Sequence, residues 1–144
     1  MKKDAQDERI EAILGKHGDS DSDEALGAFY EHLKTHLSLP CQVTGIEDFG
    51  WEESYVFGHG SQREYDQLKK THPSFRDRYT LLEITREAGS EWMLFPGEDL
   101  VAHVRRLSDG KEFWLGLAEL ETTDRKSRNH QLLDDYSVWF VNNR

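Results

Sequence analysis

Residues 78–117 constrain the fold of this chain more than any other part of the sequence. This segment reads RYTLLEITRE, EWMLF, DLVAHVRRL, a turn at SDG and then KEFWLGL, so that apolar runs alternate with Gly, Pro and Asp. Short runs separated by such residues are typical of neighbouring antiparallel strands. The segment therefore predicts an antiparallel meander, and the LAEL stretch predicts a single helical turn at Leu117–Leu120.

Helical periodicity occurs on both sides of this meander. A first helix is predicted over residues 4–16, where apolar residues at helical spacing precede two glycines. A second is predicted to run from Asp23, its expected N-cap, towards Pro40. The last is predicted over residues 127–142, and its apolar side should pack on the sheet.

The intervening region is predicted to contain shorter elements. CQVTGIEDF predicts a strand over Val43–Phe49, with Gly45 as a bulge, and a short strand is expected at Tyr55–Phe57. SQREYDQLKKTHP predicts a short helix, because Ser61 and Glu64 have capping-box spacing.

These elements predict an α+β fold. The expected architecture is a small antiparallel sheet or an SH3-like barrel, flanked by N-terminal helices and a C-terminal helix. A chain of 144 residues fits a single domain spanning 1–144, in which residues 1–20 could form a loosely attached helical extension.

Composition limits the partners. The chain has 28 acidic residues against 18 Lys and Arg, for a formal net charge of −10. This charge disfavours nucleic acid and favours cations or basic partners. Cys41 is the single cysteine, and no apolar stretch has the length of a signal or a membrane span. We therefore expect a cytoplasmic monomer that does not interact with membranes.

The stretch DSDSDEALGAFYE invites comparison with an EF-hand calcium loop. Asp19, Asp21 and Asp23 occupy its first three ligand positions. Glu24 stands where the loop needs glycine, and Tyr30 stands where it needs a bidentate glutamate. The stretch is better explained as the acidic start of a helix.

Motifs for catalysis are missing. His32 and His36 are four apart in HLKTH, but the glutamate of the HExxH motif is replaced by Leu33 and no third ligand is spaced to join them. Nothing around Cys41 suggests an activated thiolate, and FGHGS lacks the ending of a phosphate-binding loop. We therefore predict a protein that is not an enzyme.

The carboxylates around Gly50 are the most promising candidates for a metal site. No Lys or Arg occurs between Thr35 and Gln62, so these carboxylates have no local ion-pair partner in sequence. Such a loop could supply hard oxygen ligands to calcium, although ordinary solvation explains the charge as well. A second acidic cluster surrounds Glu119 and Asp124. The carboxylates around Gly50 are Glu47, Asp48, Glu52 and Glu53.

Three segments resemble the cyanobacterial calcium-binding protein family, a group of small acidic bacterial proteins: FYEHLKTHLSLPCQV, FWLGLAELETTD and LLDDYSVWF. The resemblance implies calcium binding through negatively charged residues. Cys41 departs from the apolar residue that is usual in the family, and the middle of the chain, residues 52–100, is longer than expected. Asp135 is a candidate ligand because it lies in the matching Asp-Tyr pair.

Two functional hypotheses follow. The first is a calcium buffer or sensor that binds Ca²⁺ through surface-loop carboxylates, with micromolar-to-millimolar affinity. The alternative is a protein-interaction module that docks a protein partner on exposed aromatic residues, namely Trp51, Tyr55 and Trp92. The candidate metal ligands are Glu47, Asp48, Glu52, Glu53, Asp124 and Asp135.

Overall fold

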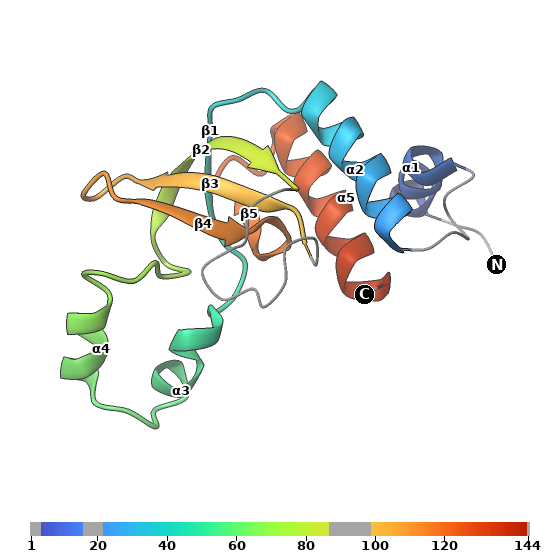
Figure 1. Ribbon diagram of the computed structural model, residues 1–144. Helices are drawn as coiled ribbons and strands as arrows, with labels where there is room; N and C mark the ends of the chain where they lie inside the picture. The colour runs from blue at the N-terminus through green and yellow to red at the C-terminus, as the bar shows by residue number, and fades with distance from the viewer. Residues whose placement is uncertain (1–3, 16–21, 87–98, 144) are drawn as a thin grey trace.

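The computed structural model describes residues 4–15, 22–86 and 99–143. Its centre is a five-stranded antiparallel sheet in the order β4-β3-β2-β1-β5 (Figure 1). The predicted α+β class is confirmed. Of the two predicted arrangements, the structure shows the sheet: among the described residues no pairing joins β4 to β5, so it stays open. The strands are β1 (Cys41–Gly45), β2 (Arg78–Thr85), β3 (Val101–Arg106), β4 (Glu112–Gly116) and β5 (Leu120–Thr122).

The three longer helices lie together on one side of the sheet (Figure 1). They are α1 (Ala5–Leu14), α2 (Ser22–His36) and α5 (Arg128–Asn143), close to the predicted ranges. Asp4 caps α1 by accepting from the backbone N–H of Asp7 at 2.8 Å. Asp23 was predicted to cap α2, but it lies inside the first turn, because the helix already includes Ser22.

The core lies where α2 and α5 meet the sheet. Phe29 of α2 contacts Tyr136 of α5 edge-on, with 5.5 Å between ring centroids, and it also packs on Trp139. Phe29 and Tyr136 are fully buried, as are Val43 and Leu81 of the sheet. These contacts explain why the apolar spacing of both helices was visible in the sequence.

Residues 50–77 form a small lobe away from the long helices, with α3 and α4 side by side (Figure 1). The predicted strand at Tyr55–Phe57 is wrong, because this region is helical. The predicted capping by Ser61 is confirmed: its hydroxyl accepts from the backbone N–H of Glu64 at 3.2 Å. The lobe contains the 3-10 turn η2 (Gly50–Glu52), α3 (Glu53–Val56) and α4 (Gln62–Leu68).

β1 ends earlier than predicted, at Gly45, because the chain is crowded there. A Cβ at this position would lie 2.6 Å from the α-carbon of Phe75, so only glycine permits the approach. The N–H of Gly45 donates to the carbonyl of Phe75 at 3.0 Å, which joins the end of β1 to the end of the lobe. Gly45 is therefore a close-contact glycine rather than the predicted bulge.

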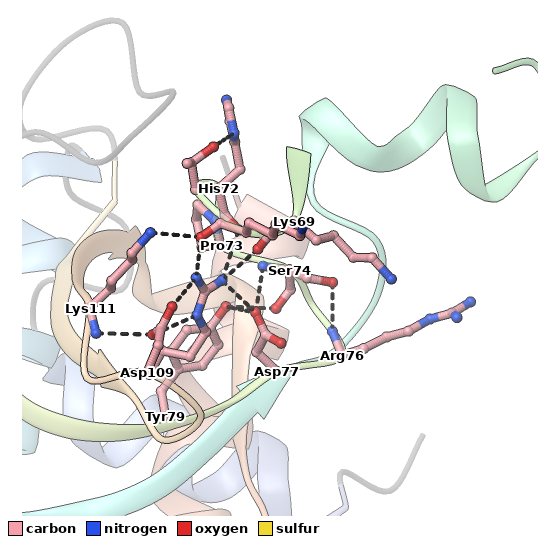
Figure 2. A network of polar contacts seen from close by, with 12 residues as sticks. Lys69, His72, Pro73, Ser74, Arg76, Asp77, Tyr79, Asp109 and Lys111 are labelled. Carbon is pink, nitrogen blue, oxygen red and sulfur yellow. Dashed lines mark hydrogen bonds and ion pairs between the residues drawn. The ribbon is translucent and has the colours of Figure 1, made fainter. Parts of the chain in front are cut away.

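The buried guanidinium of Arg106, on β3, anchors the lobe to the sheet. It donates to the carbonyls of Lys69, Lys70 and His72 at 2.9–3.1 Å. It also pairs with Asp77 at 3.0 Å and Asp109 at 2.7 Å, and these carboxylates approach the network from two sides in Figure 2. The hydrogen bond to Arg106 lowers the pKa of Asp109 to about 2, and that bond together with Asp77 raises the pKa of Arg106.

The end of the meander follows the prediction in part. LAEL forms the expected single turn, η3 (Leu117–Glu119). The three-residue strand β5 after it was missed, because LET alone is too short to show alternation. The predicted strand EWMLF lies outside the described residues. Within the described ranges, no helix combines the length and apolar character needed to cross a membrane.

Candidate functional site

An acidic cleft lies where the loop after β1, the η3 turn and the C-terminal half of α5 meet. Its volume is about 410 Å³. We call it the acidic cleft because four carboxylates line it and no Lys, Arg or His of the described residues does. The four are Glu47, Asp48, Glu119 and Asp134.

Strand pairing brings Glu47 and Asp48 of the first acidic cluster close to Glu119 of the second. Antiparallel pairing of β1 with β5 places Gly45 opposite Leu120. Just beyond, the N–H of Ile46 donates to the carbonyl of Glu119 at 2.9 Å. The loop that carries Glu47 and Asp48 therefore starts directly beside η3. The sequence alone did not predict this because β5 was not recognised.

One face of α5 forms the opposite wall. Asp134, Ser137, Val138 and Val141 all line the cleft and follow the i, i+3, i+4, i+7 spacing of a single helix face. The hydroxyl of Ser137 donates to the carbonyl of Ala118 at 3.0 Å, which fixes this face against η3.

Glu47 and Asp48 differ from the other cleft carboxylates in their partners. Glu47 is exposed and Asp48 is half-buried, and neither has a hydrogen bond or ion pair with any residue in the described ranges. Asp134 accepts from the side-chain amide of Gln6 at 2.9 Å. The oxygen lone pairs of Glu47 and Asp48 are thus available for a ligand.

A buried aspartate that the sequence reading missed lies behind the cleft. Asp99 is 6% exposed and accepts from the Tyr136 hydroxyl and from the N–H of Ala118. A Cβ placed on Gly116 would lie 2.8 Å from Asp99 Oδ2 and 3.2 Å from Glu119 Oε2, so both carboxylates contact this glycine. Asp99 opens the stretch DLVAHVRRL, outside the two acidic clusters identified in the sequence.

The predicted ligand Glu52 has a different environment. It is fully buried, and its Oε1 accepts from the hydroxyls of Tyr65 at 2.8 Å and Ser74 at 2.5 Å. Its Oε2 accepts from the backbone N–H groups of Phe49 at 3.1 Å and Phe75 at 3.0 Å. Three donors from the lobe and one from Phe49, directly before it, therefore converge on one carboxylate.

Asp135 also has an internal partner. Although it follows Asp134 directly, it lies on another side of α5, in a smaller cleft between α1, α2 and α5. Its carboxylate accepts two bonds from the guanidinium of Arg9, at 2.9 and 3.0 Å, and one from Gln6. These bonds attach α1 to α5, and they raise the pKa of Arg9.

The last two predicted ligands are exposed and lie elsewhere. Glu53 is the first residue of α3, in the lobe. Asp124 lies in the turn before α5, where its Oδ1 accepts from the N–H of Lys126 at 3.0 Å. The six predicted ligands are thus spread over the acidic cleft, the lobe, the turn before α5 and the α1–α5 contact.

A calcium ion would find suitable donor chemistry in the acidic cleft, because calcium prefers carboxylate and carbonyl oxygens. In the described part of the chain, however, no three His, Cys, Asp or Glu side chains are grouped closely enough to hold a metal ion. Calcium binding would therefore require Glu47 and Asp48 to turn towards the ion.

The two histidines of HLKTH lie together on α2. The rings of His32 and His36 are in contact, with 4.5 Å between their centroids, and burial lowers the pKa of His32.

The aromatic residues of the alternative hypothesis take part in packing within the lobe. Trp51 is half-buried and donates from Nε1 to the carbonyl of Pro73 at 2.7 Å. The ring of Tyr55 stacks on that of Tyr65, with 5.3 Å between centroids. Trp92 lies outside the described residues. The two described aromatic residues thus stabilise the lobe.

Two solved structures are similar to this fold. One is the crystal structure of CcbP from Anabaena, with a TM-score of 0.57 and 14% identity over 98% of this chain and 94% of that one. The other is a calcium-binding protein in its calcium-binding form, with a TM-score of 0.58 and 15% identity over 98% and 93%. No family model and no curated protein matches the sequence. The likeness shows a shared fold and a distant resemblance.

Proposed function

We propose that this protein binds Ca²⁺ in the acidic cleft and acts as a calcium buffer or sensor. The observation that carries the proposal is the meeting of Glu47 and Asp48 with Glu119 in one cleft, in which Glu47 and Asp48 have no hydrogen bond or ion pair with the described residues. One structural neighbour supports it, since that protein is a calcium-binding protein in its calcium-binding form. The proposal keeps Glu47 and Asp48 as ligands and adds Glu119.

The loop geometry suits a site of moderate affinity. Calcium takes six to eight oxygen ligands in flexible arrangements, and ligand charge and rigidity set its affinity. Glu47 and Asp48 lie on a loop whose base is joined to η3 by the bond from the N–H of Ile46 to the carbonyl of Glu119. Water and backbone carbonyls would complete the coordination shell. We therefore expect affinity in the micromolar-to-millimolar range.

The proposal assigns no catalytic step to the chain. Burial raises the pKa of the Cys41 thiol, which disfavours the thiolate that a nucleophile requires. We further propose that the protein acts as a monomer in the cytoplasm, in agreement with its single cysteine.

Isothermal titration of the full chain with calcium chloride tests the proposal. Saturable heat is expected for the natural sequence. The double variant Glu47→Gln/Asp48→Asn should weaken binding by about tenfold or more, because each lost carboxylate charge removes a strong electrostatic contribution to a divalent ion.

A matched control removes the same charge elsewhere. Glu53→Gln/Asp124→Asn takes two exposed carboxylates from outside the cleft and should leave the affinity almost unchanged. Equal weakening by both double variants would mean that general negative charge, rather than the cleft, attracts calcium. An absence of heat at millimolar calcium would overturn the proposal altogether.

A further inference from the structure

The lining of the acidic cleft is partly apolar, which a site for a hard cation alone does not require. Ile46 and Val141 line it with exposed fractions of 45% and 72%, beside Val138 and Phe140. Across the described ranges, these are two of the five large apolar side chains that are exposed. Keeping apolar surface in water costs free energy, so its concentration in one groove points to a partner that covers it.

The other part of the lining has the opposite chemistry. It consists largely of four carboxylates, and the described lining contains no basic side chain. The net charge of −10 strengthens the negative potential there. An anionic lipid surface would be repelled, whereas a segment with Lys or Arg beside Leu or Ile would match both the carboxylates and the apolar side chains of the cleft.

The dimensions suit a short helix. The face from Asp134 to Val141 spans two helical turns, or about 10 Å at 1.5 Å per residue. We infer that the acidic cleft is a docking groove for a basic amphipathic helix of a partner protein. Its apolar face covers Ile46 and Val141, and its basic residues pair with Glu47, Asp48 and Asp134.

This docking function goes beyond calcium binding and does not depend on it. Calcium on Glu47 and Asp48 would neutralise part of the negative charge of the cleft, so the two ligands would compete. Docking is therefore measured in the presence of EDTA, where a failure of calcium binding has no effect on the result.

The probe is a fluorescein-labelled model peptide of about 14 leucines and lysines, arranged to form an amphipathic helix. The control is the same peptide with Glu in place of Lys. Fluorescence anisotropy with the full chain should show micromolar binding of the Lys peptide and none of the Glu peptide. Raising the salt should weaken binding without abolishing it, because screening leaves the apolar contact intact.

Two variants that add the same charge separate groove binding from general attraction. Val141→Glu should weaken binding of the Lys peptide by about tenfold, since it places a charge among the apolar side chains that line the cleft. Phe57→Glu, at a side chain 66% exposed in the lobe, should leave the affinity unchanged or slightly higher. Circular dichroism confirms that both variants fold.

Three results would overturn the inference: no binding of the Lys peptide, equal affinity of the Val141→Glu and Phe57→Glu variants, or a dimer of the natural chain that Val141→Glu dissociates. The last would show that a second copy covers the cleft, and light scattering detects it. Leu107, exposed at the β3–β4 turn, is an apolar contact that such a copy could offer.

Discussion

Glu47 and Glu52 are five positions apart in one acidic stretch, yet they have opposite environments. Glu52 is fully buried and accepts four hydrogen bonds. Glu47 is exposed on the rim of the acidic cleft and has no partner among the described residues. The same contrast separates Asp135, which binds Arg9, from Asp48.

The contrast shows that carboxylate density alone does not identify a ligand site. A carboxylate that already accepts bonds from the protein contributes to folding, and its removal leaves buried donors without partners. One without such bonds adds little to stability and remains available to an ion or a basic partner. Removing a carboxylate of the first kind should therefore lower stability, whereas removing one of the second kind should weaken ligand binding.

The largest effect on stability is expected for Glu52→Gln. The amide keeps the volume of the side chain but replaces one acceptor oxygen by an NH₂ donor. In the variant this donor faces the groups that donate to Glu52 in the natural chain. Loss of charge-assisted bonds should lower the free energy of unfolding by about 2–3 kcal/mol, measured by urea denaturation. A loss below about 0.5 kcal/mol would mean that the buried carboxylate does not hold the lobe together.

Asp135→Asn should have the next largest effect. It weakens the two bonds from Arg9 that attach α1 to α5, and we expect a loss of about 1–2 kcal/mol. Hydrogen exchange should become faster in residues 5–14 and stay unchanged in the sheet. Glu53→Gln, which removes an exposed carboxylate in the lobe, is the control, and similar exchange in both variants would show that the Arg9 pair is not what holds α1.

The lowered pKa of Asp109 predicts that the stability of the protein depends on pH in the acid range. The pKa of this carboxyl is lowered from 3.8 to about 2, so its ion pair with Arg106 contributes stability that is fully present above pH 3.8 and is lost as the pH falls through about 2. Asp109→Asn should therefore be less stable than the natural chain at pH 6. The difference should shrink between about pH 4 and pH 2 in urea melts. A difference that stays constant with pH would exclude this ion pair as its origin.

The smallest effect on stability is expected for Glu47→Gln/Asp48→Asn. Because neither side chain has an internal partner among the described residues, the free energy of unfolding should change by less than about 0.5 kcal/mol in EDTA. Added calcium should raise the melting temperature of the natural chain, and the double variant should lose most of that increase. A large loss of stability without calcium would mean that these two carboxylates stabilise the fold, as Glu52 does.

The parts of the fold that depend on local pattern were predictable from the sequence. α5 follows its apolar spacing, β2 to β4 follow the alternation of the meander, and Ser61 caps α4. The strand predicted at Tyr55–Phe57 was wrong. The ring of Tyr55 stacks on Tyr65 within a helical lobe, and no local pattern in the sequence indicates that contact.

The candidate site was predictable only in part. Glu47 and Asp48 could be chosen from their lack of basic neighbours, but the same criterion also selected Glu52. The burial of Glu52 depends on Ser74 and Phe75, more than twenty positions away. The approach of Glu119 requires the β1–β5 pairing, and three residues are too few to indicate a strand.

The central claim, that the acidic cleft rather than the buried carboxylates receives calcium, is tested most directly by NMR. Amide chemical shifts of the ¹⁵N-labelled chain are followed while calcium is added. We predict saturable changes at residues 46–48, 117–120 and 134–142, with little change at Glu52 or its donors in the lobe. Changes centred on Glu52 and Glu53, with the cleft amides unmoved at millimolar calcium, would contradict the account.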